Sequence, residues 1–157
     1  MSKFVFVLTV AFDSLSTSPD CSSQDHCAEI NQEAIPKTKE DLAREDEWCN
    51  YIYGEMDETT LYVMRRHYDL TDIYGESPVV VEACRDYLER HLEVVDKHLE
   101  QNKTVLEIGF GLADIMLVSC LDWAIFYSFD LRDATKDYHQ NMIQRPNYIK
   151  AKKINYA

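Results

Sequence analysis

The sequence predicts an all-α fold, a helical bundle that follows a short irregular N-terminal extension. Glycine and proline each occur only four times in 157 residues, and such sparse turn punctuation favours long helices over many short strands. Apolar residues recur at steps of three and four through most of the chain after residue 37. Residues 112–129 carry charge only at two aspartates, which is typical of a helix in the centre of a bundle.

Residues 1–37 form the expected extension. Residues 13–36 are rich in small and polar residues without a period, which indicates a linker or a disordered segment. The apolar run 4–12 is too short to cross a bilayer, for which about 20 apolar residues are needed. Two interpretations of it stay open: a lone buried strand, or the apolar region of a signal peptide. Only Lys3 precedes the run, and no A-x-A cleavage pattern follows it.

A first helical pattern begins at Thr38 and continues to about Leu70, with Gly54 expected to bend it. A turn at 72–75 should then separate it from the next helix. The residues at the three- and four-residue steps are Leu42, Glu45, Trp48, Cys49, Ile52 and Tyr53, followed by Leu61, Tyr62, Met64, Arg65 and Tyr68.

Ser77 and Pro78 predict the start of a long helix, because serine suits the N-cap and proline the first helical position. Further helices are expected over 112–129, 133–143 and 148–154, for a total of five or six in the bundle. His91 lies on or beside the apolar stripe of the long helix, where a packed core histidine is a commoner finding than a ligand. The stripe consists of Val80, Cys84, Tyr87, Leu88, His91, Val95 and Leu99.

A structural N-cap is predicted at the start of the central helix, from Phe110, Gly111 and Asp114. With Gly111 as N-cap, Asp114 is the third helical residue, where its carboxylate can accept a hydrogen bond from the N-cap N–H. Phe110 and Ile115 have the spacing of a hydrophobic staple. A catalytic or metal-binding Asp114 is the alternative, but no partner carboxylate or histidine lies nearby in the sequence.

Charge and cysteine content limit the function. The formal net charge of -12 argues against nucleic acid or an anionic membrane as the main partner. Cys21 and Cys27 flank His26, which could indicate a metal site or a disulfide. Their spacing matches no zinc pattern, however, and no second ligand pair exists. We therefore expect free thiols in a reducing cytoplasm, with no metal and no cofactor.

Several segments in order resemble the C-terminal, all-helical domain of cytosolic glutathione transferases. The segment 110–114, Phe-Gly-Leu-Ala-Asp, is similar to the Phe-Ser/Thr-x-Ala-Asp segment that opens the family's central helix. The similarity covers residues 38–157. The other matching residues are Trp48 with 51–55, 61–67, 73–76, 120–124, and Arg145-Pro146 with Tyr148, Ala151 and Asn155.

Departures from the family pattern also matter. Gly111 replaces the usual serine or threonine, and Glu107 stands where the family usually has glycine. In the family, a thioredoxin-like domain that precedes the helices binds glutathione and activates its thiol. Here no tyrosine precedes Tyr51, and Asp13-Ser14 echoes the family's acidic-serine pair only by chance. The resemblance therefore implies a domain that is inactive alone, with glutathione as co-substrate only if a thioredoxin-like domain is supplied.

The resemblance also implies where an electrophilic substrate would bind. The wall of that site would be formed by Tyr53, Met56, Tyr62, Arg65 and Arg66. The alternative for each is packing in the bundle or a solvated ion pair. A homodimer through the helices at 40–100, or a protein partner, is expected to cover exposed apolar surface. The alternative function is a non-catalytic protein-interaction module with the same helical domain.

Overall fold

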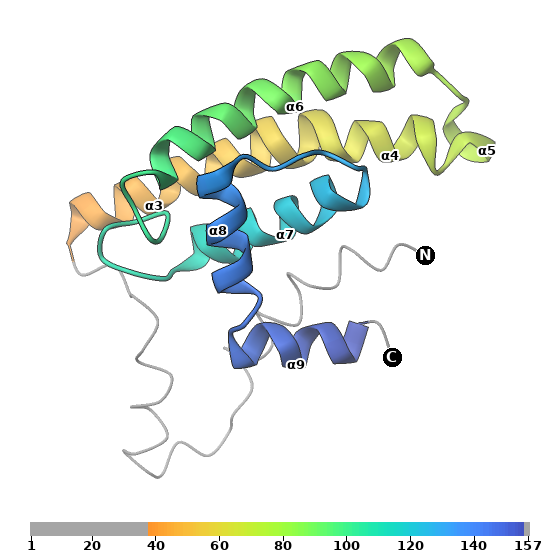
Figure 1. The fold of residues 1–157 in the computed structure, drawn as a ribbon. Helices are drawn as coiled ribbons and strands as arrows, with labels where there is room; N and C mark the ends of the chain where they lie inside the picture. Colours follow the sequence, from red (N-terminus) through yellow and green to blue (C-terminus); the bar gives the residue numbers. More distant parts are fainter. Residues whose placement is uncertain (1–37, 156–157) are drawn as a thin grey trace.

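A computed structural model describes residues 38–155 (Figure 1). Within this range the chain is helical, and its only β interaction is an isolated bridge between Leu106 and Gly109, so the predicted all-α class is confirmed. The expectations for residues 1–37 lie outside the described range, including the lone strand, Cys21 and Cys27. The helices are α3 (Lys39–Tyr51), η1 (Ile52–Leu61), α4 (Tyr62–Tyr68), α5 (Thr71–Tyr74), α6 (Pro78–Leu99), α7 (Leu112–Phe126), α8 (Asp133–Met142) and α9 (Pro146–Asn155).

The helices α3, η1 and α4 run on from one another as a single rod, and α6 lies beside it (Figure 1). The rod begins with a capping box in which Asp41 N–H donates to the Thr38 hydroxyl at 3.0 Å and Thr38 N–H donates to the Asp41 carboxylate at 3.2 Å. Near Gly54, where a bend was expected, the rod instead takes on the wider π-helical turn of η1. The Thr60 hydroxyl donates back to the Met56 carbonyl within this segment.

Helix α7 lies at the centre of the bundle, but it ends at Phe126 rather than at Phe129 as the sequence predicts. The left-handed backbone of Ser128, with φ of 64°, ends it. Phe129 N–H then donates to the Ala124 carbonyl and Ser128 N–H to the Ile125 carbonyl, which together form a Schellman motif. Phe129 itself is buried and closes the end of the core.

The core lies where the rod, α6 and α7 meet. Trp123 belongs to it, whereas Leu42 of the predicted apolar stripe is 51 % exposed. Cys49, Cys84 and Cys120 are free thiols, and residues 38–155 contain no cluster of side chains suited to a metal ion. None of the described helices has the length and apolar character needed to cross a bilayer. The fully buried aliphatic side chains are Ile52, Met56, Leu61, Met64, Leu88, Val95, Val105, Leu117 and Leu121.

One part-buried carboxylate gives a pH-dependent prediction. Burial, and to a lesser extent the charge of Glu58, raise the pKa of Asp57 from 3.8 to about 6. Because the folded-state pKa is the higher one, the protonated acid stabilises the fold below pH 4, and this contribution is lost as the pH rises through 6. Asn carries no charge at either pH. The difference in free energy of unfolding between Asp57→Asn and wild type should therefore be about 2 kcal/mol more favourable to the variant at pH 7.5 than at pH 4.5.

The measurement is urea unfolding of wild type and Asp57→Asn at pH 4.5 and pH 7.5. Asp46→Asn, which removes an exposed carboxylate on α3, is the control. A difference between wild type and Asp57→Asn that stays constant from pH 4.5 to 7.5 contradicts the prediction.

Candidate functional site

Tyr62 and Arg66, two of the predicted substrate-wall residues, lie together on α4. The Arg66 guanidinium carbon lies 4.4 Å from the centroid of the Tyr62 ring and 5.5 Å from that of Tyr74 on α5. Within the described residues, Arg66 Nε is buried and makes no hydrogen bond. The four-residue spacing of Tyr62 and Arg66 could have predicted their contact, whereas Tyr74 joins them only because the chain turns back after α4.

Arg65 has different surroundings, since its charge acts on Tyr127 at the C-terminal end of α7. The Tyr127 hydroxyl donates to Asp69 at 2.5 Å, and the Tyr68 ring meets the Tyr127 ring edge-on at 6.1 Å. Burial and the bond to Asp69 raise the pKa of Tyr127, and the charge of Arg65 opposes that rise. Arg65 and Arg66 therefore have different neighbours, because successive residues of a helix point about 100° apart.

Met56 requires a correction. It was predicted to line the substrate wall, but its side chain has an exposed fraction of 0 %, so it does not reach the surface. Ile52, Met56 and Thr60 are spaced by four residues along η1, and all three are buried. A π-helical turn of more than four residues keeps this spacing on one face, which packs against α6 and α7. Tyr53 lies elsewhere on η1 and is exposed.

Exposed apolar side chains gather at one end of the bundle, which we call the apolar end and define by Tyr68, Ile73, Val79 and Phe126. These residues come from the C-terminal ends of α4 and α7, from α5 and from the start of α6, which lie at the same end of the molecule (Figure 1). Exposed apolar side chains that form a patch often mark a surface that a partner covers.

The predicted N-cap residues meet at the start of α7. Gly111 is the N-cap, and its N–H donates to the Asp114 carboxylate at 2.9 Å. The same carboxylate accepts from Val105 N–H at 2.9 Å and from the Tyr138 hydroxyl at 2.8 Å. Burial raises the pKa of Asp114, and these three donors and the charge of Arg145 oppose the rise. With all its bonds inside the bundle, Asp114 holds the fold and has no free oxygen directed at a ligand site.

Two further contacts at this helix start come from distant parts of the chain. Leu112 N–H donates to the Glu45 carboxylate of α3 at 2.9 Å, and the Arg145 guanidinium lies 3.5 Å from the centroid of the Phe110 ring. Glu45 is part of the helical pattern in the sequence. Its role as a second cap for α7 could not be predicted from that pattern, because Glu45 is 67 residues from Leu112. The carboxylates of Asp114 and Glu45 both complement the positive end of the α7 dipole.

Comparisons with known proteins give a match to a family model and a similarity of fold to a solved structure. The family model described as glutathione S-transferase, C-terminal domain, matches residues 51–146. A solved glutathione-S-transferase from Xylella fastidiosa is similar in structure, with a TM-score of 0.63 and 18 % sequence identity over 75 % of this chain. This likeness shows the fold alone, and the chain spans 58 % of the length of that protein. No curated protein matches the sequence.

Proposed function

This chain belongs to the glutathione S-transferase C-terminal domain family, and we propose that it is the helical, electrophile-side domain of a glutathione-conjugating transferase. The match of the family model over residues 51–146 carries the proposal. We place this domain at residues 38–157 and treat 1–37 as an extension to it. The three described cysteines are free thiols, which suits the reducing environment of the cytoplasm.

We propose further that the 157-residue chain is inactive alone. All regular elements within residues 38–155 are helices. The resemblance, in contrast, assigns glutathione binding to a thioredoxin-like domain. Conjugation needs the thiolate of glutathione, whose pKa must be lowered by a nearby donor. A thioredoxin-like domain would have to supply that donor.

The direct test is retention on glutathione resin, followed by an assay with 1-chloro-2,4-dinitrobenzene. We expect neither retention nor turnover above the uncatalysed rate for the isolated 157-residue chain. Turnover that saturates with glutathione would contradict the proposed inactivity and would locate a glutathione site within this chain.

The electrophile wall is proposed to consist of Tyr62 and Arg66, joined by Tyr74, with Tyr53 and Arg65 at its margins. Two tyrosine rings within 5.5 Å of a guanidinium carbon suit an apolar, electron-poor aromatic molecule, which can pack on the rings and accept a hydrogen bond from Arg66. Met56 is left out of this wall because it is buried.

A second candidate, a non-catalytic protein-interaction module, is favoured by the apolar end. Four large apolar side chains exposed at one end of a small bundle are a surface that a partner would cover. The partner is proposed to be a second copy that docks through helices within residues 40–100, or another protein. Light scattering on a size-exclusion column should give twice the chain mass of 18.4 kDa, and a monomer mass at all concentrations would contradict the homodimer.

A further inference from the structure

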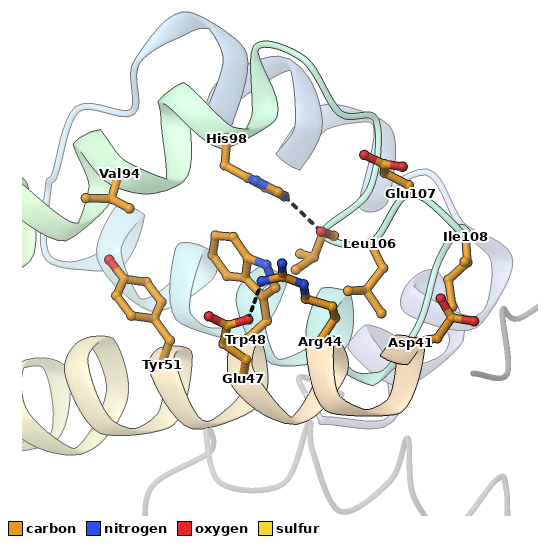
Figure 2. A pocket seen from close by; sticks show the side chains of 11 residues that line it. Asp41, Arg44, Glu47, Trp48, Tyr51, Val94, His98, Leu106, Glu107 and Ile108 are labelled. Atoms are coloured by element: carbon orange, nitrogen blue, oxygen red, sulfur yellow. Dashed lines mark hydrogen bonds and ion pairs between the residues drawn. The ribbon is translucent and has the colours of Figure 1, made fainter. Parts of the chain in front are cut away.

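A groove of about 600 Å³ lies away from the electrophile wall, between α3, the C-terminal half of α6 and the loop after α6 (Figure 2). Its apolar lining includes Trp48 and Tyr51 from α3, Val94 from α6 and Ile108 from the loop. A volume of this size is within the range of small-molecule sites.

Trp48 and Tyr51 form an aromatic corner in this groove. Their ring centroids are 5.6 Å apart and their planes meet at 84°, so one ring stands edge-on to the other. His98 packs against Trp48 at 4.4 Å and donates from Nε2 to the Val105 carbonyl at 2.8 Å. The Tyr51 hydroxyl is hydrogen-bonded to His91 Nδ1 at 2.8 Å. Both rings are thus held in position by other side chains before any ligand binds.

The rim of the groove is acidic. Asp41, Glu47 and Glu107 line it, and Arg44 is the single Lys or Arg among its described lining residues. Arg44 is paired with Glu47 at 2.7 Å, and both side chains are largely exposed (Figure 2). The lining therefore carries an excess of negative charge, in a chain whose formal net charge is -12.

We propose that this groove binds a small organic cation of the alkylated ammonium class, with its charge against the aromatic corner of Trp48 and Tyr51 and within reach of the acidic rim. Aromatic faces attract such cations through the ring quadrupole, and the alkyl groups pack on the apolar lining. A compact metal ion fits less well, because the residues that line the groove do not gather a set of oxygen or nitrogen ligands. The groove lies apart from the electrophile wall, so the inference does not depend on the proposed function.

The test compares choline with 3,3-dimethylbutan-1-ol, which has the same shape but carries carbon in place of the charged nitrogen. The chain contains two tryptophans, Trp48 and Trp123, so its indole N–H groups give two signals in a nitrogen-15 spectrum. We expect choline to shift the Trp48 signal in a saturable way and the neutral alcohol to bind at least about fivefold more weakly. Trp48→Phe assigns the signal.

Charge variants make the test sharper, because opposite changes at neighbouring positions should have opposite effects. Glu47→Gln combined with Glu107→Gln should weaken choline binding about fivefold, whereas Arg44→Gln should strengthen it about threefold. Glu82→Gln combined with Glu89→Gln, at exposed positions on α6 outside the groove, serves as the matched control and should change nothing. All titrations are run at one ionic strength.

Four results would each overturn the proposal: no saturable shift with choline, equal binding of the neutral alcohol, a shift confined to Trp123, or the same direction of change in the acidic and basic variants. Far-ultraviolet circular dichroism confirms that each variant is folded, and loss of fold cannot imitate an increase in affinity.

Discussion

Replacing Asp114 with Ala is expected to lower the free energy of unfolding by about 4 kcal/mol. Asp114 is 0 % exposed and accepts hydrogen bonds from Val105 N–H, Gly111 N–H and the Tyr138 hydroxyl. The substitution leaves these three donors without their acceptor in the interior of the bundle, and a buried donor without an acceptor is costly. It also removes the negative charge from the start of α7.

Urea unfolding followed by circular dichroism measures the effect, with Asp130→Ala as the control for an exposed aspartate after α7. Tyr138→Phe removes one of the three donors and should cost about 1 kcal/mol. Asp114→Asn keeps the volume but turns an NH₂ group toward a donor, so we expect it to be closer to Ala than to wild type. A loss below about 1 kcal/mol for Asp114→Ala would mean that the carboxylate does not hold this junction.

The start of α7 could be predicted from the sequence because its main signals are local. Gly111 and Asp114 are three residues apart, and a capping box needs only that spacing. The remaining bonds at the same place could not be predicted. Val105 and Tyr138 reach Asp114, and Glu45 reaches Leu112, only after α3, α7 and α8 have packed.

The candidate site was less predictable than the fold, since a helical pattern does not say which face a partner helix covers. Met56 was expected at the surface, but the π-helical turn of η1 aligns it with Ile52 and Thr60 on the buried side. Similarly, the end of α7 depends on the left-handed conformation of Ser128, a position at which glycine is the usual signal.

Replacing Asp96 with Ala is expected to lower the free energy of unfolding by about 3 kcal/mol. Helix α8 has Arg132 at its N-cap and receives no hydrogen bond from that side chain. Asp96 of α6 takes the place of a cap, since its carboxylate accepts from both the N–H and the hydroxyl of Thr135 at 2.9 Å. Asp96 and Thr135 are both buried, so without the carboxylate two donors remain unsatisfied between α6 and α8.

A double-mutant cycle with Thr135→Val separates the two bonds. Thr135→Val removes the hydroxyl donor alone and should cost about 1 kcal/mol, and in the Asp96→Ala background it should cost close to nothing, because the hydroxyl has already lost its acceptor. Asp86→Ala, an exposed aspartate on the same helix, controls for the loss of negative charge. If the losses in free energy of unfolding add in the double variant, the two residues act independently. In that case Asp96 of α6 does not stabilise the start of α8.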